Sequence, residues 1–349
     1  MASSPSDHTV LVLGAGASLA EAISHHPRRD RHHPPLDGNF FMRASRRIGL
    51  EPQRSERRRL LDRVVARASA LGQRDLCGSS PPVSLEEYLG RLYFDMSTAA
   101  NEANIASYYD LIRLYSSELL NTTNWMIGRT GAIRRLIDRE LRSASLSVVT
   151  FNHDLLIENA LATLSESRHP GAWCFRHSYG INFTVAELLS DGSAEYEWDC
   201  PGNRHRHVAI YKLHGSCNWV YRTRNVYPSP QVARGDRTIW LWSNIRLSEA
   251  HRMGTGTGGR SSWYMWPLII PPVYEKHSYI TGELRRVWDS AGDVLRRATR
   301  VVFWGYSFPR ADLHARYFFT ALAHDNPALR AFSSTPTLDP KTSFGGVAT

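Results

Sequence analysis

The chain contains several short apolar segments of strand length, and each is followed at once by glycine or by polar side chains. The first, Val10–Leu13, leads directly into the sequence Gly-Ala-Gly-Ala-Ser and then into apolar residues at helical spacing from Leu19 to Ile23. A strand, a tight glycine turn and the start of a helix are how an α/β nucleotide-binding domain opens. The sequence therefore predicts a first βα unit of that type.

Further strand-like segments occur only after residue 144, whereas the stretch from about Phe40 to Leu141 shows helical spacing with almost no strand-like alternation. Another helical stripe runs from Leu284 to Leu295. Strands interleaved with helices indicate a doubly wound, mostly parallel sheet of the Rossmann type that is covered on both faces. The expected later strands are Leu146–Phe151, Val208–Leu213, Thr238–Trp242, Leu268–Ile270 and Val301–Trp304.

This pattern predicts a discontinuous α/β domain with a helical insertion between the first two strands of its sheet. We assign residues 1–24 and 145–330 to the Rossmann-like domain and residues 25–144 to the insertion. Residues 331–349 are small and polar, and we expect them to form a flexible tail.

The formal net charge of +9 comes almost entirely from arginine, because lysine occurs only at positions 212, 276 and 341. The densest basic block, residues 54–74, has apolar residues at intervals of three and four. It is expected to form an amphipathic helix with a solvated arginine face. Contact with nucleic acid or with a partner protein stays open as an alternative, since basic composition is not specific.

No segment is predicted to span a membrane, because the longest apolar runs have only strand length. The N-terminus lacks the cationic and apolar regions of a leader peptide. The four cysteines form no Cys-x-x-Cys pair, so a zinc ribbon is not expected, and scattered thiols suit a reducing compartment. These features favour a cytoplasmic protein.

Ligands of a doubly wound sheet bind beyond the carboxyl ends of its strands, so the residues at those ends form the candidate site. Taken singly, each has an ordinary structural explanation as a glycine turn, a helix cap or a buried histidine. We expect no metal, because the His/Arg-rich stretches 25–35 and 203–207 lack carboxylates or cysteines at ligand spacing. The candidates are Gly14, Gly16, Ser18, Thr150, Asn152, Asp154, His214, Gly215, Gly305, Ser307 and Asp312.

Five blocks in a fixed order carry a more specific signal. They are LGAGAS, TFNHDLLIE, YKLHGSCNW, IIPP and WGYSFPRAD, and they extend over residues 11–312. In this order they resemble the sirtuin-like domain family, and specifically its bacterial antiphage-defence branch. The resemblance implies a Rossmann-type sheet that binds NAD as a substrate, with the nicotinamide ribose near Asn152 and His214.

The resemblance also implies a role for each matching residue. Asn152 would contact the ribose hydroxyls and position water, Asp154 would hold the nicotinamide amide, and His214 would be the general base. The other implied contacts are with the cofactor: Gly14, Ala15, Gly16 and Ser18 at the pyrophosphate and Ser307 at a second phosphate position. Asp312 matches the family's pattern after the last strand. We also expect cofactor contacts at Thr150, Gly215, Gly305 and Asp312, because they stand at the same strand ends.

Departures from related proteins narrow the function. Leu19 stands in place of the third glycine of the dehydrogenase fingerprint, so hydride transfer loses support. Protein-deacylating sirtuins carry a zinc module with two Cys-x-x-Cys pairs, which this chain lacks, so deacylation is disfavoured. His153 stands where deacylases have an aliphatic residue. The sequence after Leu329 is a poor strand, so we expect the adenine side of the site to be incomplete or completed by another chain.

The leading hypothesis is an NAD⁺ hydrolase that releases nicotinamide and ADP-ribose, and that a phage signal or a partner activates. An alternative is a nucleotide-binding assembly subunit that serves a DNA-translocating ATPase or a nucleic-acid-guided partner. Deacylation or ADP-ribosyl transfer is a third possibility. We also expect a homo-oligomer.

Overall fold

The computed structural model describes the chain in sixteen stretches. They are residues 7–26, 33–79, 81–126, 131–142, 144–174, 178–179, 184–189, 192–195, 207–223, 227, 240–242, 264–271, 280, 282–308, 312–326 and 329–333.

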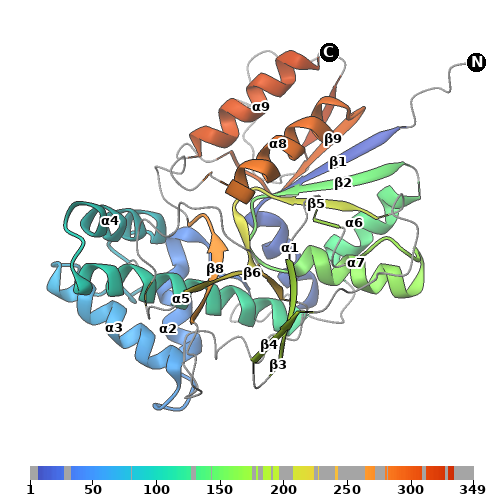
Figure 1. Ribbon diagram of the computed structural model, residues 1–349. Coiled ribbons are helices and arrows are strands. Elements are labelled where there is room, and N and C mark those ends of the chain that lie inside the picture. The colour runs from blue at the N-terminus through green and yellow to red at the C-terminus, as the bar shows by residue number, and fades with distance from the viewer. Residues whose placement is uncertain are drawn as a thin grey trace, which may run out of the picture.

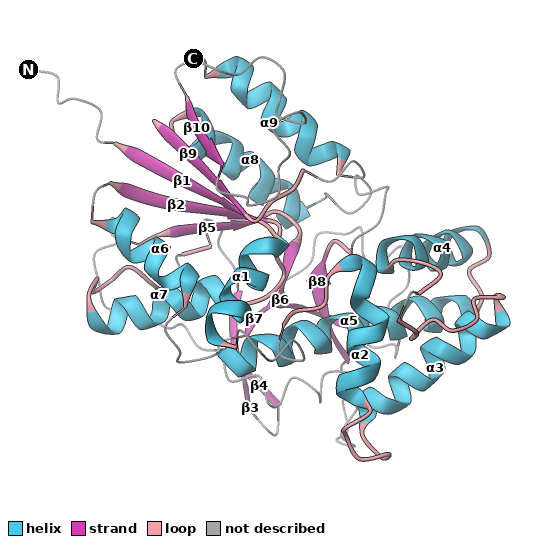
Figure 2. Cartoon of the chain, turned by 180° about the vertical axis from the view of Figure 1, so that it is seen from behind, coloured by secondary structure: helices cyan, strands magenta, loops and turns pink. Residues whose placement is uncertain are grey.

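A five-stranded parallel sheet forms the centre of the α/β part, as the sequence predicts (Figure 2). Its strands lie in the order β10-β9-β1-β2-β5, and all four neighbouring pairs are parallel. The chain lays down β1, β2 and β5 in one direction and then places β9 on the other side of β1. The order therefore reverses between β1 and β9, which is where doubly wound folds bind ligands. The strands are β1 (His8–Leu13), β2 (Ser145–Thr150), β5 (Ala209–Lys212), β9 (Arg300–Trp304) and β10 (Arg330–Ser333).

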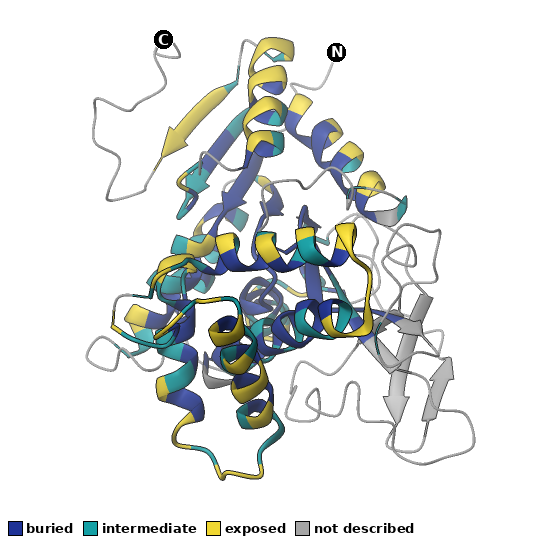
Figure 3. Cartoon of the chain, turned by 90° about the vertical axis from the view of Figure 1, so that its left-hand side faces the viewer, coloured by how far each residue is buried: buried dark blue, intermediate teal, exposed yellow. Residues whose placement is uncertain are grey.

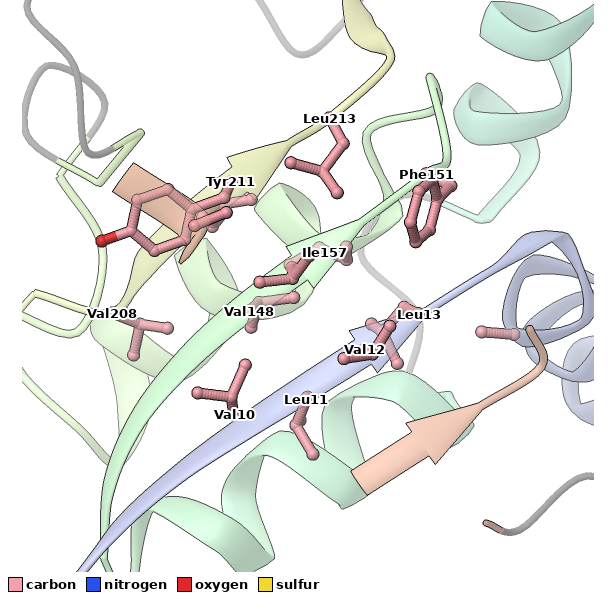
Figure 4. Close-up of a cluster of buried hydrophobic side chains, with 14 of the residues drawn as sticks. Val10, Leu11, Val12, Leu13, Val148, Phe151, Ile157, Val208, Tyr211 and Leu213 are labelled. Carbon is pink, nitrogen blue, oxygen red and sulfur yellow. The ribbon is translucent and has the colours of Figure 1, made fainter. Parts of the chain in front are cut away.

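Helices cover both faces of this sheet (Figures 1 and 2). The segments that the sequence predicts as buried strands are buried: Val10, Leu11, Val12 and Val148 have no exposed surface. Figure 4 shows this core, with Phe151 and Leu213 at the carboxyl ends of β2 and β5. The covering helices are α1 (Ala15–His25), α6 (Ala132–Leu141) and α7 (Leu156–Ser167) on one face, and α8 (Gly282–Arg296) and α9 (Leu313–Asp325) on the other.

A helical module lies to one side of the sheet (Figure 1). Its hydrophobic core is separate from that of the parallel sheet, and Tyr221, Trp266 and Ile269 also contribute to it. It confirms the helical character predicted for this stretch, but the module is shorter than residues 25–144. Ile133 and Ile137 of α6 pack into the core of the sheet, so α6 belongs with the α/β part. The module consists of η2 (Asp37–Asn39), α2 (Phe40–Ile48), α3 (Glu56–Ala70), α4 (Leu85–Thr98) and α5 (Glu102–Met126).

The arginines of α3 are not simply a solvated face. Arg57 is buried and pairs with Glu118 of α5, which is fully buried. Arg63 binds Asp110 of α5 through its Nε, at 2.6 Å. Because these cations are neutralised between two helices, part of the basic block serves packing inside the module rather than an external partner.

A second five-stranded sheet has the order β4-β3-β7-β6-β8, and all of its strands lie between β2 and β9 in the sequence. Two strands predicted for the parallel sheet, Thr238–Trp242 and Leu268–Ile270, belong here instead, as β7 and β8. The chain leaves the first sheet at Gly215, whose φ of +79° turns it directly from β5 into β6. The strands are β3 (Thr184–Leu189), β4 (Gly192–Glu195), β6 (Gly215–Thr223), β7 (Trp240–Trp242) and β8 (Tyr264–Ile269).

The end of the described chain corrects the prediction of a tail that begins at residue 331. Residues Arg330–Ser333 form β10, which pairs in parallel with β9 and completes the sheet beyond it. The strand is exposed throughout, as Figure 3 shows, so its sequence carries none of the apolar pattern of a buried strand. Its Phe332 packs under the Arg300 guanidinium, 5.5 Å from the ring centroid. The strand expected to be missing from this edge of the sheet is therefore present as β10. Residues 334–349 lie outside the described stretches.

Three further observations concern the cysteines, the length of the helices and the His/Arg-rich stretches. Cys77 and Cys217 are free thiols, but Cys174 is disulfide-bonded, so the expectation of scattered thiols is wrong for that residue. Among the described residues, no helix is both long enough and apolar enough to cross a membrane. Most of the His/Arg-rich stretches 25–35 and 203–207, considered for metal binding, lies outside the described residues.

Candidate functional site

The structure brings Asn152 and His214 to the same edge of the parallel sheet. Thr150 of β2 is in register with Lys212 of β5, and each candidate residue lies two positions beyond its member of that pair. The rings of both neighbours of Asn152 contact His214: the ring centroid of Phe151 lies 5.1 Å from that of His214, and the ring centroid of His153 lies 6.1 Å from it. Two residues that are 62 positions apart in the sequence thus lie at the same edge of the sheet.

Asn152, Ser18 and Asp154 form one hydrogen-bonded group. The Nδ2 atom of Asn152 donates to the Gly14 carbonyl and to Ser18 Oγ, both at 2.9 Å. Ser18 Oγ in turn donates to Asp154 Oδ2 at 2.6 Å. All three side chains are buried. Ser18, predicted as a pyrophosphate contact, therefore has its hydroxyl engaged in joining the two predicted catalytic residues.

These bonds fix which way the Asn152 amide is turned. The Gly14 carbonyl can only accept, so the NH₂ end of the amide must face it. Both amide hydrogens are then engaged, while no described residue donates to Asn152 Oδ1. The amide oxygen is the part of this residue that remains able to bind a ligand.

Asp154 and Thr150 are held by the start of α7 and by the strands. Asp154 Oδ1 accepts from the N–H of Leu156 at 3.1 Å, which satisfies one unpaired donor of the α7 N-terminus. Thr150 Oγ1 donates to the Leu13 carbonyl and accepts from the Asn152 N–H. Thr150 thus shapes the strand end, and its hydroxyl is fully buried.

Sequence reasoning missed a buried ion pair directly behind Asp154. Lys212 Nζ donates to the main-chain carbonyl of Asp154 and to Glu158 Oε1, the latter at 2.8 Å. Glu158 also accepts from the hydroxyl of Tyr179 at 3.1 Å. Lys212 has no exposed surface. The available signal was compositional, because one of only three lysines stands inside an apolar strand segment.

The hydrogen bonds of His153 explain why a polar residue stands here, where the deacylases have an aliphatic one. Its Nε2 lies 3.0 Å from the Ile270 carbonyl and its Nδ1 lies 2.9 Å from the hydroxyl of Tyr115 on α5. A carbonyl only accepts, so Nε2 carries the hydrogen and Nδ1 accepts from the phenol. Burial raises the pKa of Tyr115 well above its ordinary value, which keeps that phenol a donor. His153 thereby connects the helical module to the site.

The glycines after β1 interlock with the end of β9. Gly14 N–H donates to the Trp304 carbonyl at 3.2 Å and Gly16 N–H to the Gly305 carbonyl at 2.8 Å. A Cβ on Gly305 would lie 2.0 Å from the Ala17 nitrogen. Gly14 and Gly16 were predicted to bind phosphate through their N–H groups, but these groups donate hydrogen bonds to the end of β9 instead. Ala15 is an exposed residue, and among the described residues no hydrogen bond engages its N–H.

Replacing Gly305 tests this interlock. Gly305→Ala must place a side chain at a φ of +67° and force the start of α1 away from β9. Gly72→Ala is the matched control, since Gly72 has a φ of +82° with nothing within 4 Å of an added Cβ. We expect the control to lose about 1–2 kcal/mol from left-handed strain alone, and Gly305→Ala to lose clearly more. Thermal unfolding of both variants decides; equal losses would contradict the interlock.

The remaining candidates lie after β9 and after β5. Ser307 is exposed, and the next residue, Phe308, has a strained φ of +51°. Asp312 is buried and faces His214, with its Oδ2 3.6 Å from Nε2 of the imidazole. Gly215 cannot accept a side chain, because its Cβ would lie 2.1 Å from the Leu268 carbonyl. Gly215 and Gly305 thus shape the backbone at the rim.

The residues at this edge fit a dinucleotide in chemical terms. The Asn152 amide oxygen, the buried Asp154 carboxylate and the His214 imidazole lie beside the point where the strand order reverses. The positive end of α1, the N–H of Ala15 and the hydroxyl of Ser307 are suited to phosphate oxygens.

The sequence matches no protein-family model, and no curated protein matches it.

Proposed function

We propose that the chain hydrolyses the bond between nicotinamide and ribose in NAD⁺, with nicotinamide and ADP-ribose as products. The observation that carries this proposal is the buried group of Asn152, Ser18 and Asp154, with His214 placed beside it from the next strand. The resemblance of five ordered sequence blocks to the sirtuin-like domain family supports the same reaction.

The chemistry of the reaction matches the groups that are present. As the bond to the cationic nicotinamide breaks, positive charge develops on the ribose ring, much as in glycoside hydrolysis. The amide oxygen of Asn152 is the negative end of a dipole, and the Asp154 carboxylate carries a negative charge. Both stabilise positive charge on the ribose, and the effect is larger in a buried site that excludes water. His214 accepts the proton of the attacking water, whose oxygen forms the new bond to the ribose carbon, and later releases that proton to solvent.

Binding and orientation fall to the residues around this group. The N-terminus of α1 attracts the diphosphate, and Ser307 supplies a hydroxyl to it. Asp154 would accept from the nicotinamide amide. Its own position is fixed by Ser18, by the Leu156 N–H and by Lys212 behind it. A fixed acceptor reduces the entropy that must be lost to align the substrate.

In a cell, such an activity would deplete NAD⁺ and would have to be held back until needed. We infer that a phage signal or a partner protein activates it, as the resemblance implies. The contact of Tyr115 with His153 gives the helical module a direct connection to the site through which binding elsewhere could act.

The proposal is tested by product analysis. Purified protein, alone and co-expressed with the products of neighbouring genes, is incubated with NAD⁺, and nicotinamide and ADP-ribose are quantified by chromatography. We expect equal amounts of the two products for each NAD⁺ consumed. The Asn152→Ala protein, prepared identically, excludes a contaminating enzyme. NAD⁺ binding without turnover in any combination would instead support the assembly-subunit alternative. Label transferred from NAD⁺ to protein would support ADP-ribosyl transfer.

A further inference from the structure

Asp312 is a buried carboxylate that the sequence places among the cofactor contacts, but its neighbours indicate another role. It lies at the N-cap of α9, where Oδ1 accepts from the Ala315 N–H at 3.4 Å. Its Oδ2 accepts from the hydroxyl of Tyr306 at 3.1 Å and lies 3.6 Å from Nε2 of His214. Only 2 % of Asp312 is exposed.

Two donors hold this carboxylate in place beside the imidazole. Burial, and next the charge of Asp312 itself, raise the pKa of Tyr306 well above its ordinary value, so the phenol remains a donor. The separation of 3.6 Å exceeds hydrogen-bond length, but the attraction between charges falls slowly with distance and is strong where water is excluded. Catalytic contacts of this kind are often long without substrate and shorten when it binds.

The other groups described around His214 do not supply this charge. His153 lies with its ring centroid 6.1 Å away and carries no carboxylate; its ring nitrogens face the Ile270 carbonyl and the Tyr115 hydroxyl. Phe151 and Trp288, with ring centroids at 5.1 and 6.4 Å, are uncharged. Asp312 reaches the imidazole from the chain that follows β9, whereas His214 follows β5.

We propose that Asp312 is a positioning residue, which orients the imidazole of His214 and balances the positive charge that the ring acquires when it takes up a proton. The identity of the reaction rests on the proposed function, but the pairing of Asp312 with His214 does not. Asp312 would therefore act through His214 rather than touch the dinucleotide.

Asp312→Asn is the sharpest test, because its amide oxygen can keep the helix cap to the Ala315 N–H, and asparagine is as good a cap as aspartate. The NH₂ group that replaces Oδ2 then donates to the Tyr306 oxygen instead of accepting from it. The change thus removes the charge and reverses the direction of one hydrogen bond. Without the carboxylate the imidazolium is less stable, so the pKa of His214 falls. The acidic limb of the rate profile should move to lower pH. Turnover on the neutral plateau should fall about 10–100-fold, because a weaker and less firmly oriented base takes up the proton of water less readily.

Tyr306→Phe is the opposing variant. It keeps the ring that stacks on Phe151 at 4.2 Å but removes the hydrogen bond that spreads the charge of the carboxylate. The pKa of His214 should then rise, which general structural damage would not cause together with a fall in Asp312→Asn. Asp325→Asn, an exposed change at the other end of α9, should leave both activity and titration unchanged.

Nuclear magnetic resonance titration of the His214 imidazole, assigned by comparison with His214→Gln, separates this inference from the proposed function. A lowered pKa in Asp312→Asn and a raised one in Tyr306→Phe support the pair even if the protein does not cleave NAD⁺. An unchanged His214 pKa in Asp312→Asn overturns the pair, even if NAD⁺ is hydrolysed. Should Asp312→Asn fail to fold, an unchanged or lowered pKa in Tyr306→Phe overturns it.

Discussion

Asn152→Ala is expected to lower NAD⁺ turnover about 10²–10⁴-fold, the range typical of a single positioned polar group. The substitution removes the amide oxygen that no described residue binds, and with it the dipole that, in the proposed reaction, faces the developing charge on the ribose. It also releases Ser18, so Asp154 loses part of its fixed orientation. The effect should appear mainly in kcat, because the lost interaction strengthens as the bond breaks.

The control for this loss is Asn159→Ala on α7. Asn159 Nδ2 donates to the Met126 carbonyl at 3.4 Å, so the control also removes an amide that binds a main-chain oxygen near the site. We expect Asn159→Ala to retain turnover within about twofold, while both variants lose roughly 1–3 kcal/mol of stability at most. Turnover by folded Asn152→Ala at the wild-type rate would reject the role assigned to this amide.

Lys212→Met is expected to lower the free energy of unfolding by about 3–5 kcal/mol, which is a large effect for a single substitution. The change leaves Glu158, of which 1 % is exposed, as a buried carboxylate without its cation. The main-chain carbonyl of Asp154 also loses its donor. The melting temperature from scanning calorimetry should fall by several degrees, and the Asp154 loop should lose order.

Two further variants distinguish a buried charge from a general loss of packing. Arg285→Met removes a cation from an exposed pair with Asp289 and should cost under about 1 kcal/mol. Lys212→Met combined with Glu158→Leu should recover part of the lost stability, since no uncompensated charge remains. A double variant that melts below Lys212→Met alone would show that Glu158 is not the source of the penalty.

The parallel sheet was predictable because its strands are short, β-branched and bounded by glycine or polar residues. Buried central strands are rich in apolar residues: Val10–Leu13 is a continuous apolar run, and β2 contains Val148 and Val149. The second sheet was not predictable in the same way. The turn at Gly215 sends β6 away from β5 without a break in the sequence, and the assignment of β8 to either sheet depends on pairing across about 45 residues. The exposed β10 carries no apolar signal at all.

The positions of the candidate residues at the strand ends could be predicted from the sequence, whereas the contacts that each residue makes could not. The register of Thr150 with Lys212 makes the meeting of Asn152 and His214 a consequence of parallel pairing. Ser18, Gly14 and Gly16 were expected to face phosphate, but side-chain and backbone contacts across the sheet engage them first. Lys212 and Glu158 were missed because a single lysine in an apolar strand does not reveal its partner.

The most direct test of the central claim is an experimental structure of the His214→Ala protein with NAD⁺ bound. The account predicts that the nicotinamide ribose lies at the carboxyl ends of β2 and β5, within hydrogen-bond distance of Asn152 Oδ1, and that the diphosphate lies at the N-terminus of α1. A dinucleotide bound elsewhere, or no bound dinucleotide at saturating concentration, would contradict it.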